Sequence, residues 1–502
     1  MFSRLLGFAR DVILAAVIGA GPIADAFFLA FRLPTIIGAL FANGSFNNAF
    51  VPVFSGLRAN HGREDAITFF EHVSSFTVIF VLPLVVVMQI AMPWIIHVVA
   101  PGFAEEGERY RLAVDYCRIA MPYLCFFSWF VIACGVLNSF DRFAAAAYAP
   151  TLLNLSLIGA LFLVVPFTGA PGHVLSWAFM ASGLAQAVWI FFAYRRLGLR
   201  FRIRLPRLTP AVRRLMRLLP SVGAQSALAQ AHILVDMLLA SLLFTGAVSY
   251  LYYAERILLL PRVAIVGATA TALLPLLSRK IHGGHLSEGV ESLNRAMEYT
   301  LLLTLPATAA LVTIAEPIMT VLFERGAFTN ADALGSAAAV AAFAIGLPGF
   351  TIGLLAKQMF FAHEDMVTPL KISVIGTISH IVFALALVGP LAHVGIALAM
   401  AIASTVGMTL TMIVLHRRGQ IWLDAQLRQR APRILIASLG MAGVLWVMNN
   451  ALAAHLAGGL IERFVSLAVL IAVGGGAYVV LVQLLGGASF KELIRLFRRT
   501  PA

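Results

Sequence analysis

The feature that most constrains this chain is a succession of apolar runs, each long enough to cross a bilayer. We count fourteen runs of about 20 residues, separated by charged or Gly/Pro-rich breaks. Only 12% of the 502 residues are charged, and the mean hydropathy of +0.92 lies far outside the usual composition of soluble domains. The sequence therefore predicts an all-α, polytopic membrane protein with fourteen transmembrane helices. The expected spans are residues 5–20, 25–54, 69–99, 115–138, 145–165, 175–194, 215–244, 248–277, 297–323, 331–361, 368–387, 394–416, 432–453 and 464–485.

Positive charge is distributed unevenly between the two sets of alternate loops. One set, which includes both ends of the chain, holds 25 of the 36 Lys and Arg residues, whereas the opposite set holds Arg109, Arg111, Arg325 and Arg463. Because loops rich in Lys and Arg stay in the cytoplasm, we expect a multi-pass protein with both termini cytoplasmic. The net charge of +13 is then mostly a matter of topology, and it needs no nucleic-acid partner.

An internal repeat relates the first twelve spans. Residues 28–32 are echoed by residues 252–256, and residues 51–55 by residues 274–278, at offsets of 224 and 223. An offset of six spans preserves orientation, which indicates two pseudo-symmetric six-helix lobes about an axis along the membrane normal. The expected domains are residues 1–205 (helices 1–6), 206–420 (helices 7–12), and 421–502, which holds helices 13 and 14 and a basic amphipathic tail for anionic lipid.

Several charged side chains fall within or beside the expected spans. They are Arg4, Arg10, Arg32, Arg256 and Lys357, together with Asp11, Asp25, Asp236 and Glu255. An arginine facing lipid at mid-bilayer costs roughly 2.5–3.5 kcal/mol, so we expect these cations to line a polar cavity between the lobes. In the first helix, Ser3, Gly7 and Arg10 share one face. Arginine binds phosphate through fixed donors and keeps its proton, so such a cavity predicts an anionic substrate, a phosphate or diphosphate.

Each of these residues also has a structural interpretation. Arg10 can pair with Asp11 and Arg256 with Glu255, and a cation near a span end can extend to the interface. Asp236, within an apolar run, indicates a proton or sodium site or else a carboxylate satisfied by neighbouring groups. The first span also has features of a secretory signal peptide, but Arg10 and Asp11 interrupt its apolar core.

Enzyme signatures are missing from the sequence. There is no HExxH motif, P-loop or GxSxG motif, so we expect no catalytic residues, no cofactor and no metal centre beyond sodium at Asp236. Cys117, Cys125 and Cys134 are expected to be small core residues rather than a disulfide framework or a metal site.

Several motifs together resemble the MurJ (MviN) lipid II flippases of the multidrug/oligosaccharidyl-lipid/polysaccharide exporter superfamily. The first is the run from Phe2 to Asp11 (FSRLLGFARD). The others are Gly19–Gly21, Asp25–Phe28 before Leu33-Pro34, Phe46–Pro52 (FNNAFVP), Ala100–Phe103 (APGF), Ala149–Asn154 (APTLLN) and Tyr253–Arg256 (YAER).

This resemblance implies transport of the undecaprenyl-diphosphate-linked peptidoglycan precursor, lipid II, from the cytoplasmic to the periplasmic leaflet of the bacterial inner membrane by alternating access. It implies that Arg4, Arg10 and Arg256 hold the diphosphate in a central cavity and that Asp25 lies toward the outer side. To these cavity residues we add Ser3, Arg32, Glu255 and Lys357. It also implies that residues 432–485 form a groove for the lipid tail, and a sodium site in some members adds weight to Asp236.

We further expect a monomer that works with other cell-wall synthesis proteins and is driven by the membrane potential or by a sodium or proton gradient. The chain departs from the family pattern at Gly38, Ala39 and Leu259, where many relatives carry charged residues, so a less charged cavity is expected. Other hypotheses are a flippase for another polyprenyl-linked glycan, a drug/cation antiporter of the same superfamily, and an enzyme acting on the same lipid. An antiporter requires an acidic cavity, and an enzyme requires reactive clusters in its loops.

Overall fold

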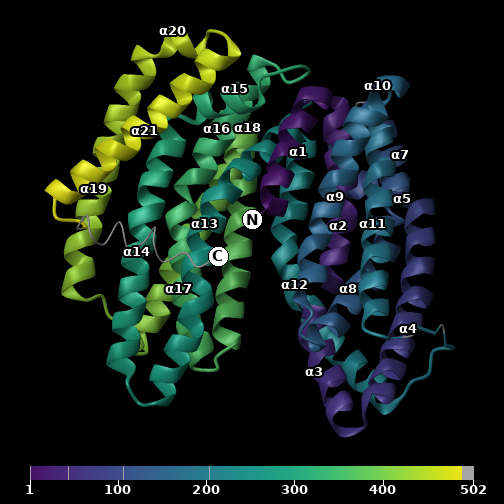
Figure 1. The fold of residues 1–502 in the computed structure, drawn as a ribbon. Coiled ribbons are helices and arrows are strands. Elements are labelled where there is room, and N and C mark those ends of the chain that lie inside the picture. The colour runs from purple at the N-terminus through teal and green to yellow at the C-terminus, as the bar shows by residue number, and fades with distance from the viewer. Residues whose placement is uncertain (1, 43–44, 106, 200, 203, 489–502) are drawn as a thin grey trace. The chain divides into compact units, whose positions relative to one another are not determined.

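The computed structural model describes the chain except for residues 1, 43–44, 106, 200, 203 and 489–502. Within these bounds the regular structure is helical, as the sequence predicts, apart from one isolated antiparallel bridge between Arg325 and Phe328. The described residues form two compact units (Figure 1). Unit 1 contains the described residues up to Ser249 together with 325–328, and unit 2 contains residues 250–324 and the described residues from Thr329 onward.

Twelve of the helices belong entirely to unit 1 as it is described. They are α1 (Phe2–Ile18), α2 (Pro22–Ala42), α3 (Ser45–Asn60), α4 (Arg63–Ile90), α5 (Met92–Val99), α6 (Pro101–Glu105), α7 (Glu108–Ala120), α8 (Tyr123–Ser139), α9 (Phe143–Leu163), α10 (Val165–Thr168), α11 (Pro171–Arg196) and α12 (Pro210–Ser241).

Helix α13 (Ala247–His282) begins in unit 1 and continues into unit 2. The remaining helices of unit 2 are α14 (Leu286–Thr313), α15 (Ala315–Phe323), α16 (Asn330–Ile345), α17 (Leu347–Ala362), α18 (Val367–Arg417), α19 (Ala425–Ala451), α20 (Ala453–Leu456) and α21 (Leu460–Leu484). The expected division at residues 205/206 and 420/421 stays a prediction. It was drawn from a sequence repeat, whereas the two compact units are defined by which residues pack together.

Ten helical segments among the described residues are long and apolar enough to cross a membrane, so the chain is a multi-pass membrane protein. One of them, α18, has 51 residues and is interrupted at Ala392, which has φ 48° and ψ −132°. A straight helix of that length would measure about 76 Å, more than twice the hydrocarbon thickness of about 30 Å. The interruption therefore separates the two spans expected at 368–387 and 394–416. The total of fourteen stays a prediction.

Prolines divide some expected spans into two helices and leave others continuous. Pro93, Pro122 and Pro348 lie where α5, α8 and α17 begin, which suits a residue without a backbone N–H. In contrast, Pro34 and Pro52 lie inside continuous helices. A proline in an apolar run therefore does not by itself show whether the helix is interrupted at that residue.

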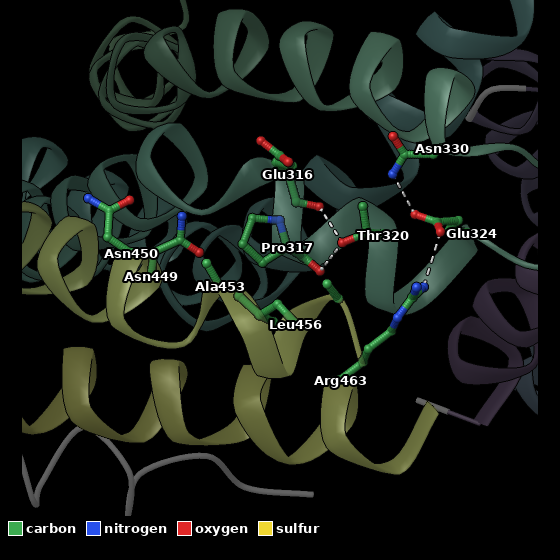
Figure 2. A pocket seen from close by; sticks show the side chains of 11 residues that line it. Glu316, Pro317, Thr320, Glu324, Asn330, Asn449, Asn450, Ala453, Leu456 and Arg463 are labelled. Atoms are coloured by element: carbon green, nitrogen blue, oxygen red, sulfur yellow. Dashed lines mark hydrogen bonds and ion pairs between the residues drawn. The ribbon is translucent and has the colours of Figure 1, made fainter. Parts of the chain in front are cut away.

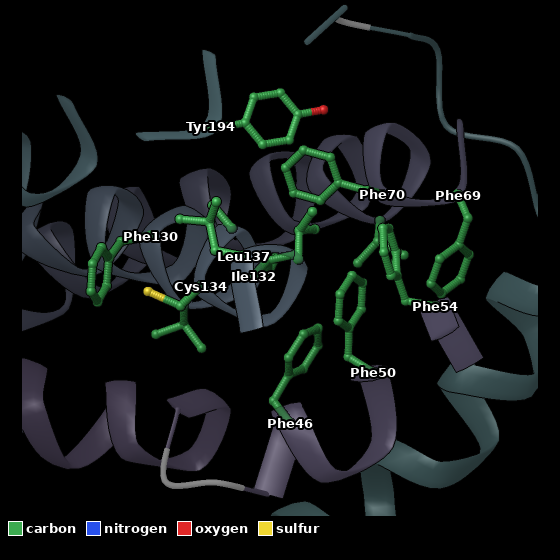
Figure 3. Close-up of a cluster of buried hydrophobic side chains, with 14 of the residues drawn as sticks. Phe46, Phe50, Phe54, Phe69, Phe70, Phe130, Ile132, Cys134, Leu137 and Tyr194 are labelled. Carbon is green, nitrogen blue, oxygen red and sulfur yellow. The ribbon is translucent and has the colours of Figure 1, made fainter. Parts of the chain in front are cut away.

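The core of unit 1 includes a stack of aromatic rings from α3 and α4. The ring of Phe50 lies 5.6 Å from those of Phe46 and Phe54 and 5.5 Å from that of Phe69, and all three contacts are stacked (Figure 3). Phe46 and Phe50, which lie in one of the motifs behind the resemblance, therefore supply packing between α3 and its neighbours.

In unit 2, α19 and α21 lie side by side and pack against α14 (Figure 1). The buried hydroxyl of Tyr478 on α21 donates a hydrogen bond to the carbonyl of Leu302 on α14, at 2.7 Å. Leu439 of α19 and Ile471 of α21 are among the large apolar side chains of this pair that are exposed. The final two expected spans are thus joined to the rest of unit 2 through α14.

The basic segment between α11 and α12 packs on α4. Buried Glu71 of α4 accepts hydrogen bonds from the backbone N–H of Arg202 at 2.8 Å and from Nε of Arg204 at 2.5 Å. The segment ends at Thr209, whose hydroxyl caps α12 by accepting from the backbone N–H of Val212. The expected linker is therefore attached to unit 1 at Arg202 and Arg204.

Candidate functional site

Arg10 of α1 is buried, with 4% of its surface exposed. Its Nη2 and Nε donate to Oδ1 of Asp11, at 2.6 and 3.0 Å, and its Nη1 donates to Oδ1 of Asn154 on α9, at 3.0 Å. The guanidinium also lies 5.4 Å from the centre of the Phe31 ring. The pairing with Asp11, one of the sequence alternatives, is therefore present, and it fixes the direction of the guanidinium.

Asn154 connects three positions along the predicted polar face of α1. Besides accepting from Arg10, it donates through Nδ2 to the carbonyl of Ser3, at 3.0 Å. A Cβ on Gly7 would lie 3.4 Å from the same Nδ2, so Gly7 allows the two helices to approach closely. The shared face of Ser3, Gly7 and Arg10 is thus confirmed, and it packs against α9.

Arg4, one position beyond Ser3, has a different environment. Its side chain is exposed and forms no hydrogen bond or ion pair with the part of the chain that the structure describes. All its donors therefore remain available to a ligand, whereas Arg10 donates to Asp11 and Asn154.

Asp25 is completely buried at the start of α2. Its carboxylate accepts from the backbone N–H groups of Gly246 and Ser249, at 2.7 and 3.0 Å, and from the hydroxyl of Ser249, at 2.6 Å. Nη1 of Arg109, itself buried against the Phe103 ring, lies 3.4 Å away. The structure thus joins Asp25 to α7 and to the start of α13. No described residue of α1 makes a hydrogen bond to the Asp25 carboxylate.

In unit 2 the predicted residues lie on α13 and α17. The half-buried guanidinium of Arg256 lies 4.4 Å from the centre of the Tyr252 ring, one turn earlier on α13. Its neighbour Glu255 is also half-buried. Lys357 donates through Nζ to the hydroxyl of Ser373 on α18, at 3.1 Å. The aromatic ring and the hydroxyl restrict the positions of these two cations.

The two remaining predicted residues are Arg32 and Asp236. Arg32 is half-buried on α2, and Asp236 is buried on α12 with 4% of its surface exposed. Among the described residues, no group of three or more His, Cys, Asp or Glu side chains is placed to hold a metal ion. The role of Asp236 as a sodium site stays a prediction. The three cysteines are free.

Sequence reasoning did not predict several residues of these networks, among them Asn154, Arg109 and Ser249. Asn154 is a polar residue inside an apolar span and ends one of the motifs behind the resemblance, which was a usable signal. Arg109 was assigned only to the outer set of loops, although Asp25 was expected on the same side. The participation of these and the other predicted residues in substrate binding stays a prediction.

Comparison with known proteins places these residues in context. A family model described as lipid II flippase MurJ matches residues 14–466. A protein from Rhizobium meliloti (strain 1021), named "Probable lipid II flippase MurJ", is 39% identical over 504 residues, which cover 99% of this chain and 94% of that protein. A Burkholderia cenocepacia protein named "Lipid II flippase MurJ" is 30% identical over 90% of this chain and 88% of its own length.

Solved structures show the same fold at lower identity. One titled "Lipid II flippase MurJ, inward closed conformation" has a TM-score of 0.79 at 23% identity and covers 98% of both chains. A multidrug resistance MATE family transporter of the MOP superfamily, in an inward-facing conformation, has a TM-score of 0.69 at 18% identity and covers 83% of this chain and 94% of its own.

Proposed function

This chain belongs to the MurJ family of lipid II flippases, and we propose that it moves lipid II from the cytoplasmic to the periplasmic leaflet of the bacterial inner membrane for peptidoglycan synthesis. The observation that carries this proposal is that the family model and the named relatives match nearly the whole chain. As a flippase, the protein returns its substrate chemically unchanged, so its residues bind and release and do not catalyse.

We propose that Arg4, Arg10 and Arg256 bind the diphosphate of the substrate. Arg4 is exposed, Arg10 is oriented by Asn154, and Arg256 is positioned on the Tyr252 ring. Guanidinium groups match phosphate oxygens in geometry and remain charged at every physiological pH. Ser3, Arg32, Glu255 and Lys357 complete the proposed cavity, and alternating access carries the bound head group between leaflets.

The same proposal extends to the binding of the lipid tail and to the side of the membrane on which the termini lie. The packed pair α19 and α21 exposes apolar side chains, which suits contact with the polyprenyl tail. The excess of Lys and Arg on one side supports cytoplasmic termini. We propose a monomer without a cofactor, acting beside other cell-wall synthesis proteins and driven by the membrane potential or by an ion gradient, with buried Asp236 as the candidate sodium or proton group.

Reconstitution tests this function directly. The purified protein is placed in vesicles with labelled lipid II, and the label exposed in each leaflet is followed with and without a membrane potential and sodium. We expect Arg256→Gln to slow flipping at least about tenfold, because charge-assisted hydrogen bonds contribute roughly 1.5–3 kcal/mol each. The double substitution Arg10→Gln with Asp11→Asn removes both partners together, so it tests Arg10 without leaving a buried, uncompensated carboxylate.

Arg196→Gln is the matched control, since Arg196 is an exposed arginine at the end of α11. It should flip lipid II at the wild-type rate. If all three variants flip normally, the arginines do not bind the substrate. If the wild type itself does not flip lipid II but transports a cationic dye, the antiporter hypothesis replaces the present one.

A further inference from the structure

A polar pocket lies within unit 2, between α15, the start of α16 and the segment from the end of α19 to the start of α21 (Figure 2). Its volume is about 410 Å³. The expected topology places this end of unit 2 on the outer side of the membrane, because Arg325 and Arg463 belong to the outer set of loops. None of the residues proposed to bind the diphosphate lines this pocket.

One side of the pocket is formed by a satisfied group of charges. Glu324 accepts from Nη1 of Arg463, at 3.1 Å, and from Nδ2 of Asn330, at 2.9 Å. Nε of Arg463 donates to the carbonyl of Gly458, at 3.0 Å. Within the described residues, Nη2 of Arg463 makes no hydrogen bond, so the guanidinium keeps donors for an anionic group.

The other side contains acceptors that lack donors. The exposed carboxylate of Glu316 forms no hydrogen bond or ion pair with the described residues. Oδ1 of Asn449 is buried and accepts no hydrogen bond there. Figure 2 shows Glu316 and Asn449 at one end of the pocket, and Glu324 and Arg463 at the other.

The residues that line the pocket carry a net negative charge. Arg463 neutralises Glu324, and Glu316 then carries one uncompensated negative charge. A zwitterionic ligand would pair with both ends, with a cationic N–H donor at Glu316 and Asn449 and an anionic group at the remaining donor of Arg463, Nη2. An uncharged ligand of the same size would leave Glu316 unpaired.

We propose that this pocket binds a zwitterionic group that carries a primary ammonium and an acidic group. The ammonium lies at Glu316 and Asn449, and the acid lies at Nη2 of Arg463. Phosphatidylethanolamine of the outer leaflet carries this chemistry, and so does an amino-acid segment of a peptide-bearing head group. The placement of the pocket at the outer leaflet rests on the proposed orientation of the protein. The binding of a zwitterionic group does not depend on whether the protein flips lipid II.

Native mass spectrometry of the full-length protein tests this chemistry with two lipids of identical acyl chains. Phosphatidylcholine has the same phosphate, but its quaternary ammonium has no N–H to donate. We expect the wild type to retain phosphatidylethanolamine about tenfold more tightly than phosphatidylcholine, because only phosphatidylethanolamine can donate a charge-assisted hydrogen bond to Glu316. Glu316→Gln should abolish this preference, whereas Arg463→Gln should weaken both lipids equally, because both carry the phosphate.

Glu462→Gln is the matched control, since Glu462 is exposed beside Arg463 on α21 and does not line the pocket. It should leave lipid retention unchanged. A second arm uses lysine as a soluble probe. If lysine binds in a Glu316-dependent way while the two lipids bind equally, the occupant is an amino-acid segment.

If neither the lipids nor lysine respond to Glu316→Gln, the proposal is wrong. Flipping by the wild type is measured in parallel. Glu316-dependent binding by a protein that does not flip lipid II would overturn the proposed function and leave the pocket assignment standing.

Discussion

Two groups of charged residues in this protein differ in how completely the protein itself satisfies them. In unit 2, Glu298 of α14 is almost completely buried and bonds to Arg295, Arg430 and Gln426, while Arg295 also bonds to Asp424. Two acids face two arginines from α14 and α19, and both oxygens of Glu298 are occupied. In unit 1, α1 presents the exposed Arg4, and two donors of Arg10 share a single oxygen of Asp11.

The difference separates charges that stabilise the fold from charges that are available to a substrate. The Glu298 group has no net charge and joins α14 to α19, which lie far apart in the sequence. In the α1 group, the donors of Arg4 make no hydrogen bond or ion pair with the described residues. We therefore expect substitutions in the first group to lower stability and substitutions in the second to lower transport.

The largest effect is expected from Glu298→Ala. It leaves two arginines next to each other without their shared carboxylate, and breaking a buried ion pair costs about 3–5 kcal/mol. Thermal unfolding of the purified protein measures this loss. Glu288→Ala on the same helix is the control, because its pair with Lys280 is exposed and contributes about 0–1 kcal/mol. Equal losses for the two variants would contradict the distinction between the groups.

Arg4→Gln should show the opposite pattern. Because Arg4 is exposed and unpaired within the described residues, its loss should change stability by no more than about 0.5 kcal/mol. Flipping of labelled lipid II should fall about tenfold, since a charge-assisted hydrogen bond to phosphate is lost. A variant that flips normally but unfolds earlier would place Arg4 among the structural charges.

The sequence predicted the helices because apolar runs and their breaks are local properties. Gly389 and Pro390 marked the interval between two spans, and the structure interrupts α18 nearby, at Ala392. Individual prolines were less informative, because Pro93 lies where a helix begins and Pro34 lies inside one. Whether the backbone continues past a proline depends on neighbouring turns that hydropathy does not report.

The sequence predicted which kinds of residue form the site, but it did not predict which residues bond to one another. Asp11 follows Arg10 directly, so this ion pair was visible in the sequence. Asn154 and Arg109 lie 144 and 84 positions from their partners, and only the packing of helices reveals such pairs. The same reason explains why the polar pocket of unit 2 was not predicted, since it brings together α15, α19 and α21.

The smallest effect is expected from an exposed carboxylate–arginine pair. Asp365 precedes α18 and accepts from the Thr368 hydroxyl, from the backbone N–H groups of Val367 and Thr368, and from Arg418, at 2.7 Å. These donors, led by the Thr368 hydroxyl, hold the pKa of the Asp365 carboxyl well below its usual value. Asp365→Ala should cost about 1 kcal/mol at neutral pH, as for other helix caps.

The pH dependence of this loss gives its cause. A carboxyl whose pKa is lowered on folding stabilises the protein above its unfolded pKa of about 3.9, and this stabilisation disappears as the pH falls further. The difference in unfolding temperature between the wild type and Asp365→Ala should therefore be constant near neutrality and shrink below about pH 4. Asp365→Asn should show an intermediate loss, because its side-chain oxygen still caps the helix while the charge facing Arg418 is gone. A difference that persists unchanged in acid would mean that packing, and not the charge, accounts for the contribution of Asp365.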